Sequence, residues 1–443
     1  MRLRRALAAG LLVTLAGLSG TIGMAGASAA PSSHPSKTPS TKAPADTTHS
    51  SSPSSTVPPS TDCPSPGRPR SPLTVTPWYA EQLDYPALSQ INQGLYTQSG
   101  SFDGRPFSAG DPVKVVTIDS GLNPYRSYDK PNPVFAGADL GPLKKIEQWQ
   151  YPDCVGHGTQ VASLIIAQPN GSRLIGIAPR VRLYPIQYTN VDSGGKPKDL
   201  VAALSYAINV IRPRVINMSL QLVNAPGRAV MDLLKKAERR RIVIVAAGGN
   251  DNGQGDGPVY PARYSKHMKN IIAVAAVGQD GLAAGFSISG NYMDVAAPGD
   301  KVPVAQSYGG ALPGAVGTSF AAPLVTGTVA LLLATHPTMS PLAVRNRLEA
   351  TADPPPGTRP NAHYGYGVIN PVQAITSERN DLVKAPKARR GAPLAAPHPP
   401  AAPDRTLEHR ALAVAVVLLG LAALTVTGAA VLRGRRRAPL HHG

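Results

Sequence analysis

The sequence Gly317-Thr318-Ser319-Phe320-Ala321-Ala322-Pro323, followed by the apolar run 324–333, is the stretch on which the fold depends. A Gly-Thr-Ser turn that leads into a helix places a small hydroxyl, that of Ser319, at the helix N-terminus. Free backbone N–H groups and the helix dipole favour negative charge there. The small residues Ala321 and Ala322 allow the helix to lie deep in a core. The same turn can also cap an ordinary core helix, so the stretch predicts a buried helix and only the possibility of a site.

Apolar runs and helical patterns alternate along the chain before this helix. The β-branched run 113–118 predicts a strand covered on both faces. Further strands are expected at 181–186, 215–218, 242–247 and 271–277, and helices at 158–167, 200–211, 229–240, 317–334 and 341–351. Strands that alternate with helices imply a parallel sheet with right-handed crossovers. The sequence therefore predicts an α/β fold with a mostly parallel central sheet flanked by helices.

Both ends of the chain carry targeting patterns. Residues 1–29 combine a basic head, an apolar middle and the small residues Ala27-Ser28-Ala29, which indicates a secretory signal peptide; an uncleaved anchor helix is the alternative. Residues 411–432 carry no charge and are long enough to span a bilayer as a helix. The basic tail 433–443 is then expected in the cytoplasm. We expect an exported domain held to the cell membrane by one C-terminal span.

Composition divides the region between these ends. Residues 30–71 are rich in Pro, Ser and Thr and are expected to be disordered, and 377–410 form a Pro/Ala-rich linker. The globular block is 113–376, preceded by an N-terminal extension, 72–112, whose apolar residues are expected to pack on the block as a helical lead-in. The alternative is that this extension occupies a cleft as an inhibitory propeptide.

The formal net charge of +18 is concentrated outside the block. Residues 1–70 carry 7 basic and 2 acidic side chains, residues 377–443 carry 11 and 4, and residues 71–376 carry 26 and 20. Most of the excess therefore suits targeting and membrane topology. A nucleic-acid partner is not expected.

The chain has two cysteines, Cys63 and Cys154, and the predicted topology exports both. An even number in an oxidising compartment favours one disulfide, and two free thiols are the alternative.

Three reactive residues stand at the ends of predicted elements. Asp119 ends the first strand, His157 opens a helix, and Ser319 opens another. Ligands bind at the carboxyl ends of strands in an open parallel sheet, and all three would converge there. A serine hydroxyl becomes nucleophilic when a base removes its proton, which a histidine can do near neutral pH. A buried carboxylate would fix the imidazole tautomer and stabilise the imidazolium.

A donor for an oxyanion is also present. Asn250 ends the loop after the predicted strand 242–247. Its side-chain amide and the Ser319 backbone N–H would together form the oxyanion hole. Each residue alone has an ordinary alternative, as a turn, helix-start or loop residue. Together, in the order Asp, His, Asn, Ser at these positions, they indicate acyl transfer to serine.

The motifs Val116-Thr-Ile-Asp119-Ser-Gly, Gly156-His157-Gly-Thr, Ala247-Gly-Gly-Asn250 and Gly317-Thr-Ser319-Phe-Ala-Ala-Pro resemble those of the subtilisin-like serine peptidases, the S8 family. The resemblance covers about 113–374 and implies a three-layer subtilisin-like fold. Within that family, the signal peptide, Pro-rich segments and C-terminal span resemble the mycosins, membrane-anchored proteases of type VII secretion systems. The positions of Cys154, just ahead of His157, and of Cys63, on its N-terminal side, also resemble a cysteine pair of the mycosins, and this resemblance implies a disulfide between them.

The resemblance also implies substrate-binding residues. Ser219-Leu220-Gln221 corresponds to a strand that pairs with bound peptide, and Ala247-Gly248-Gly249 to the lining of the pocket for the residue before the scissile bond. Gln221 replaces the usual Gly, which adds a side chain where substrate backbone should pass. Gln160 and Ser163 replace a common His and a common Gly after His157. These changes bear on specificity more than on activity.

The sequence thus predicts a membrane-anchored extracellular serine endopeptidase acting on protein or peptide, with the type VII secretion machinery as a possible partner. No cofactor is expected and no metal, since the histidines and carboxylates lack ligand spacing. A structural component of a secretion complex, with weak or dispensable peptidase activity, is the alternative. A lipid esterase is disfavoured because no Gly-x-Ser-x-Gly elbow surrounds Ser319.

Overall fold

The computed structural model describes residues 70–123, 125–127, 130–131, 135, 139–140, 153–189, 195–251, 257, 259–307 and 309–377. The predicted signal peptide, the Pro/Ser/Thr-rich segment as far as residue 69, the linker beyond 377, the span 411–432 and the basic tail lie outside these residues.

Within this part of the chain, seven strands form a sheet in the order β11-β10-β9-β8-β3-β7-β6. Every neighbouring pair is parallel, so the predicted parallel sheet is confirmed. The strands are β3 (Lys114–Asp119), β6 (Asp139–Leu140), β7 (Arg182–Gln187), β8 (Val215–Met218), β9 (Val243–Ala247), β10 (Ile271–Val277) and β11 (Val295–Pro298).

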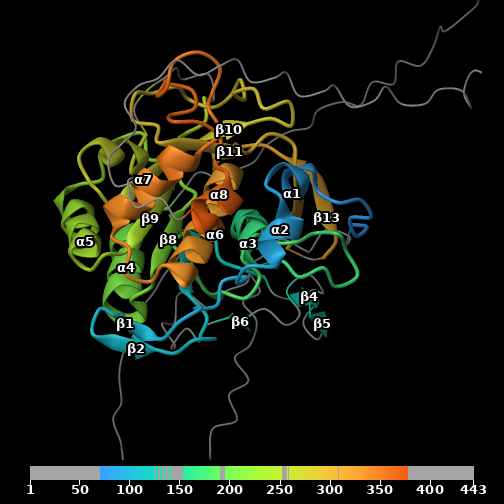
Figure 1. The fold of residues 1–443 in the computed structure, drawn as a ribbon, viewed down its shortest axis with the longest axis horizontal. Helices are drawn as coiled ribbons and strands as arrows, with labels where there is room; N and C mark the ends of the chain where they lie inside the picture. The colour runs from blue at the N-terminus through green and yellow to red at the C-terminus, as the bar shows by residue number, and fades with distance from the viewer. Residues whose placement is uncertain are drawn as a thin grey trace, which may run out of the picture. The chain divides into compact units, whose positions relative to one another are not determined.

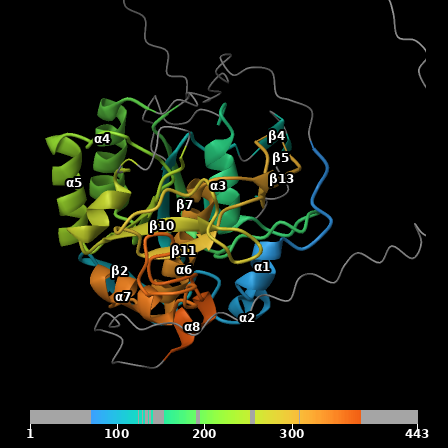
Figure 2. The same ribbon diagram turned by 90° about the horizontal axis from the view of Figure 1, so that it is seen from above.

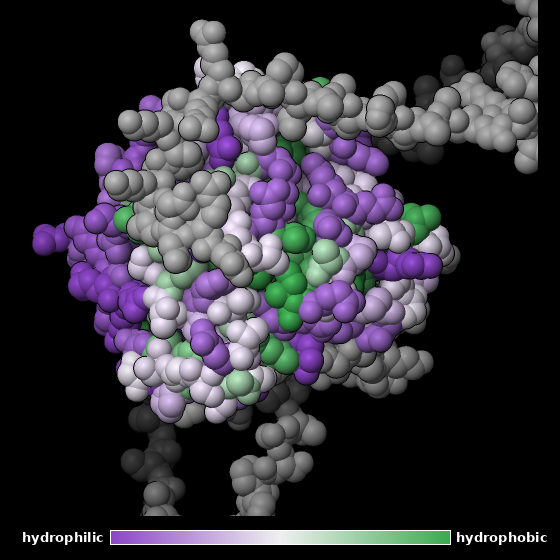
Figure 3. Space-filling model, viewed as in Figure 1, coloured by the Kyte–Doolittle hydropathy of each residue, from purple (hydrophilic) through white to green (hydrophobic). Residues whose placement is uncertain are grey.

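Helices cover both faces of this sheet, and successive strand residues point into two different cores. In β9, Val243 and Val245 join the core formed with α3 (His157–Ile166) and α6 (Thr318–Thr335). Ile244 and Ala246 join the core formed with α4 (Pro197–Tyr206) and α5 (Arg228–Arg239). Figures 1 and 2 show the two layers on opposite sides of the strands. The outer face of α5 is hydrophilic (Figure 3), as its pattern of three buried and nine partly or fully exposed residues requires.

The helix α6 lies within the core of the described domain. Among the described residues it is the one helix long and apolar enough to cross a membrane, and 89% of it is buried in the protein. It is therefore the core helix that its small and aliphatic residues predict, with its N-terminus at the edge of the sheet where the strands end.

The N-terminal extension packs against the opposite end of α6. It contains α1 (Trp78–Gln82), α2 (Tyr85–Ser89) and a hairpin of β1 (Gly100–Phe102) and β2 (Arg105–Phe107). The Asn92 amide donates to the Leu331 carbonyl at 2.9 Å, and the Thr97 N–H donates to the Ala334 carbonyl at 3.0 Å. Tyr79 and Leu83 are buried in the core.

Several elements differ from the sequence prediction. The single helix expected at 200–211 ends at Tyr206 and continues as a π-helical turn, η2 (Ala207–Ile211). Strand β11 was not predicted, because Val-Ala-Ala-Pro has little β propensity; nor were the hairpin β12 (Val302–Ala305) and β13 (Ala311–Ala315) or the short β4 (Tyr125–Ser127) and β5 (Lys130–Pro131). The remaining elements are η3 (Ala262–Lys266), α7 (Pro341–Thr351) and the closing helix α8 (Pro371–Thr376).

Candidate active site

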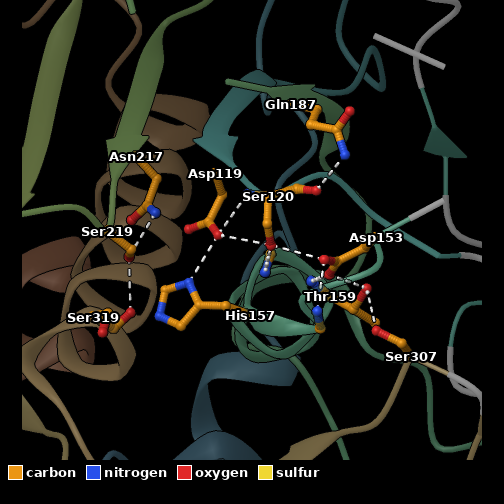
Figure 4. A network of polar contacts seen from close by, with 12 residues as sticks. Asp119, Ser120, Asp153, His157, Thr159, Gln187, Asn217, Ser219, Ser307 and Ser319 are labelled. Atoms are coloured by element: carbon orange, nitrogen blue, oxygen red, sulfur yellow. Dashed lines mark hydrogen bonds and ion pairs between the residues drawn. The ribbon is translucent and has the colours of Figure 1, made fainter. Parts of the chain in front are cut away.

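The structure brings Asp119 and His157 into contact. Asp119 is the last residue of β3 and His157 the first of α3, and the His157 Nδ1 lies 2.8 Å from the Asp119 Oδ1. Asp119 is 3% exposed, whereas the imidazole is 31% exposed. The other ring nitrogen faces the side on which Ser319 lies (Figure 4). One imidazole nitrogen is thus held by a buried carboxylate, and the opposite edge is turned towards the start of α6.

A buried network fixes the approach of α3 to β3. The carboxylate of Asp153, which is 0% exposed, accepts hydrogen bonds from the Gly156 N–H at 2.7 Å, from the Thr159 N–H at 2.7 Å and from the Thr159 hydroxyl at 2.6 Å. It also accepts one from the Ser120 hydroxyl at 2.7 Å. Asp153 therefore caps the helix that begins at His157, because Gly156 at the N-cap has no side chain to do so.

Ser120 joins this network to the carboxylate that holds the imidazole. Its hydroxyl accepts a hydrogen bond from the Gly158 N–H at 2.8 Å, and its own N–H donates to the Asp119 Oδ1 at 2.8 Å. A β-carbon on Gly158 would lie 2.2 Å from the Gly121 carbonyl oxygen, so only glycine permits this close approach. Sequence reasoning missed Asp153 and Ser120. An acidic residue four positions before His157 was the available signal.

Ser319 lies in the first turn of α6, where its neighbours satisfy its backbone carbonyl. Pro323 has no N–H to bond that carbonyl, and the Ser219 hydroxyl donates to it instead at 2.8 Å. The Ser219 oxygen in turn accepts a hydrogen bond from the Asn217 amide at 2.9 Å. This chain ties the start of α6 to the end of β8 (Figure 4).

Asn250 is held so that its amide NH₂ group faces the same region. Its Oδ1 accepts hydrogen bonds from the Thr318 N–H at 2.9 Å and from the Thr318 hydroxyl at 3.0 Å. A β-carbon placed on Gly317 would lie 3.0 Å from the Ser319 Oγ and 3.3 Å from the Asn250 Nδ2. The Ser319 hydroxyl oxygen and the Asn250 amide nitrogen therefore border the same point, which no side chain fills because residue 317 is glycine. A carbonyl group there could meet both.

The six residues predicted to bind substrate follow two neighbouring strand ends, since Met218 of β8 is paired with Ala246 of β9. In the first segment, the Ser219 hydroxyl bonds the Ser319 carbonyl and Leu220 is buried. In the second segment, Ala247-Gly248-Gly249, the Gly248 N–H donates to the Val274 carbonyl at 2.8 Å. Both segments thus border the site.

The resemblance implies that Gln221 adds a side chain where substrate backbone should pass. In the structure this side chain bonds with the backbone of Asn250, at 2.9 Å to the N–H and 3.2 Å to the carbonyl. The Gln221 amide therefore links the segment that follows β8 to the segment that follows β9.

Cys154 lies in the loop before α3 and is not a free thiol. Its expected partner, Cys63, is outside the described residues. Within the part of the chain that is described, no group of three or more His, Cys, Asp or Glu side chains is arranged to hold a metal ion.

Comparison with known proteins agrees with this geometry. The model of the subtilase family, peptidase S8, matches residues 110–367. Subtilisin E of Bacillus subtilis (strain 168) is 36% identical over 299 residues, which cover 67% of this chain and 72% of that protein. The subtilisin of Bacillus pumilus is 37% identical over 268 residues, 60% of this chain and 91% of that protein.

The fold is also similar to that of MycP1 from the ESX-1 type VII secretion system, with a TM-score of 0.57 and 25% identity over 71% of this chain and 89% of that chain. MycP1 with its N-terminal propeptide removed gives a TM-score of 0.54 at 25% identity, over 70% of this chain and 100% of that one. The chain therefore belongs to the subtilase family and is a subtilisin-like serine peptidase.

Proposed function

We propose that this chain is an exported serine endopeptidase in which Asp119, His157 and Ser319 form the catalytic triad and Asn250 stabilises the oxyanion. The observation that carries the proposal is the 2.8 Å contact between His157 and Asp119, beside a helix start where Ser319 and the Asn250 amide border one open point. Acyl transfer to serine needs an oriented base, a hydroxyl and an oxyanion donor near one point, and these contacts support that assignment.

In the proposed reaction, the Ser319 Oγ attacks the scissile carbonyl while His157 Nε2 takes its proton. Asp119 stabilises the imidazolium that forms, and the negative oxygen is held by the Ser319 N–H and the Asn250 amide. His157 then gives the proton to the leaving amine as the tetrahedral intermediate collapses to an acyl-enzyme. A water molecule then attacks the acyl carbon while the same imidazole takes its proton, and the imidazolium returns that proton to the Ser319 oxygen as the acyl–oxygen bond breaks.

The N-terminal extension is, in this proposal, a permanent part of the peptidase domain rather than an inhibitor. Its hydrogen bonds with α6 fall at Leu331, Ala334 and Thr335, whereas Ser319 is at the other end of this 18-residue helix, about 18–24 Å away at 1.5 Å per residue. A disulfide between Cys63 and Cys154 would fasten the segment that precedes the extension to the loop before His157.

We further propose that residues 411–432 anchor the enzyme in the membrane, with the domain outside and the C-terminus in the cytoplasm, and that it works with type VII protein secretion. The similarity to MycP1 supports this role. A structural contribution to a secretion complex is the alternative.

One experiment tests activity and role together. The detergent-solubilised full chain is treated with a fluorescent fluorophosphonate, and secretion is measured in cells that carry each variant. Labelling in the wild type, lost in Ser319→Ala and kept in Ser340→Ala, is the expected result. Ser340 is a matched control because it caps the N-terminus of another helix, α7. An unlabelled wild type would contradict the proposal, and normal secretion by Ser319→Ala would favour the structural role.

A further inference from the structure

The side chain of Gln221 joins the segment that follows β8 to the segment that follows β9. Its Oε1 accepts a hydrogen bond from the Asn250 N–H at 2.9 Å, and its Nε2 donates to the Asn250 carbonyl at 3.2 Å. Because the N–H can only donate and the carbonyl can only accept, these partners fix the orientation of the amide. The side chain thus pairs with Asn250 as a neighbouring strand would.

Gln221 lies just beyond the point where β8 and β9 stop pairing, at Met218 and Ala246. After Met218, the chain turns to Tyr260, with two hydrogen bonds of 3.0 Å between the backbones of Leu222 and Tyr260. After Ala246, the other chain segment stays beside β10. A crevice between the carboxyl ends of adjacent parallel strands is where such sheets bind ligands. In this protein the side-chain amide of Asn250 lies beside that position.

Apolar side chains fill the inner end of the same crevice. A β-carbon on Gly249 would lie 2.5 Å from the Val259 Cγ2 and 3.1 Å from the Ile288 Cδ1, and one on Gly248 would lie 2.6 Å from the Met293 Cε. Val259 is 1% exposed. The space beside Gly248 and Gly249 is therefore already occupied.

We propose that Gln221, backed by Val259, limits the substrate residue on the acyl side of the scissile bond to small side chains such as glycine, alanine and serine. This inference rests on the proposed function. A carbonyl attacked by Ser319 with its oxygen at the Asn250 amide carries its own α-carbon next to Asn250, at the mouth of the crevice. A large side chain entering there has to displace Gln221 and break both of its hydrogen bonds.

The displacement has a second cost, because the Asn250 backbone loses the contacts that steady the oxyanion donor. Two neutral hydrogen bonds lost without replacement correspond to about a ten-fold to one-hundred-fold loss in kcat/KM. The discrimination is therefore expected in kcat/KM for large residues and not in the reaction of the serine itself.

The test uses the detergent-solubilised full chain and two fluorogenic peptides that differ only at the residue before the scissile bond, alanine in one and phenylalanine in the other. For the wild type we expect kcat/KM to favour alanine at least ten-fold. Gln221→Gly is expected to raise the phenylalanine-to-alanine ratio at least ten-fold, and Gln221→Ala or Val259→Ala should change it in the same direction. Val223→Gly, two residues along and 61% exposed, should leave the ratio unchanged.

Two outcomes overturn the inference. A wild type that prefers phenylalanine, or a folded Gln221→Gly and Val259→Ala pair with the wild-type ratio, shows that these side chains do not set the pocket. Fluorophosphonate labelling separates this failure from that of the enzyme. If the chain is labelled and active but the ratio is unchanged, only the inference about specificity is contradicted. If the chain is not labelled and cleaves neither peptide, both the proposed function and this inference are contradicted.

Discussion

The Ser120 hydroxyl donates a 2.7 Å hydrogen bond to the Asp153 carboxylate, 33 residues away in the chain. Ser120 follows Asp119, the last residue of β3, and Asp153 caps the helix that begins at His157. This hydrogen bond therefore links the segment that positions Asp119 to the helix start that positions His157. The positions of carboxylate and imidazole are thus set by one buried network rather than by their own contact alone (Figure 4).

Replacing Asp153 should therefore impair both stability and catalysis. Asp153→Ala leaves four hydrogen-bond donors without their acceptor in a buried site, which predicts a loss of about 3–5 kcal/mol in the free energy of unfolding. Asp153→Asn keeps the shape and should fold, but with a lower kcat and little change in KM, because it disturbs the imidazole rather than substrate contacts. Urea unfolding and steady-state kinetics check this. Equal kcat in Asp153→Asn and the wild type would show that the network is only structural.

Asn250→Ala should keep the fold and slow the chemical step. Removing one oxyanion-hole side chain costs about 10²–10³ in kcat, a range measured in a relative of this chain. The expected signature is a fall in kcat at nearly constant KM, since the proposed role of the amide is to stabilise the transition state. Asn250→Ala also frees the Thr318 hydroxyl, so Thr318→Ala is the matched control, with a smaller expected loss. An Asn250→Ala enzyme with wild-type kcat would remove Asn250 from the mechanism.

Glu349 predicts a pH dependence of stability that is independent of the active site. Burial and repulsion from Asp294 raise the pKa of Glu349 from 4.5 to about 8, against the lowering attraction of Arg345 and Arg359. The folded state therefore binds a proton that the unfolded state has released, and the free energy of unfolding falls as pH rises from about 4.5 to 8. Asp294, whose pKa burial raises to about 6, acts in the same direction at lower pH.

Glu349→Gln should flatten this profile. Thermal unfolding between pH 5 and pH 8 is expected to show a fall in Tm in the wild type that is several degrees smaller in the variant. Glu81→Gln, the same substitution at an exposed position on α1, serves as the control. Profiles of equal slope in wild type and Glu349→Gln would mean that this carboxyl titrates normally in the folded protein.

Tyr79 tests whether the N-terminal extension belongs to the folded domain. Its ring is fully buried and its hydroxyl donates to the Ile175 carbonyl at 3.3 Å. Tyr79→Ala should destabilise the domain by about 3–5 kcal/mol, whereas Tyr79→Phe should cost about 1 kcal/mol. If the extension were an inhibitor instead, loosening it with Tyr79→Ala would raise peptidase activity without lowering Tm.

The sequence alone predicts those parts of the fold and of the candidate site in which the chemistry requires one type of residue at the end of a strand or helix. Local patterns predict strand β3, helices α3 and α6, and the candidate residues Asp119, His157 and Ser319 at their ends. A buried strand must be apolar, and a serine nucleophile needs a base. The predicted fold class is confirmed by the parallel sheet. The roles of Asp119, His157, Ser319 and Asn250 remain proposals, which labelling and kinetics of their variants can decide.

What the sequence could not supply were contacts between distant segments. Asp153 reads as a loop residue until its four donors are seen around it, and the sequence does not show that the Gln221 amide bonds Asn250, 29 residues away. Likewise β11 owes its strand conformation to pairing with β10 and not to its own residues. Such features depend on tertiary packing, which overrides local propensity.

The central claim is that Asp119, His157 and Ser319 act as one unit, and the rate at which Ser319 is phosphonylated tests it most directly. The full chain is treated with a fluorophosphonate, the modified residue is located by mass spectrometry, and the second-order rate constant is compared among wild type, His157→Ala and Asp119→Asn. We predict modification at Ser319 in the wild type and rates at least about 10³-fold lower in both variants. Modification elsewhere, or equal rates in folded wild type and His157→Ala, would contradict the account.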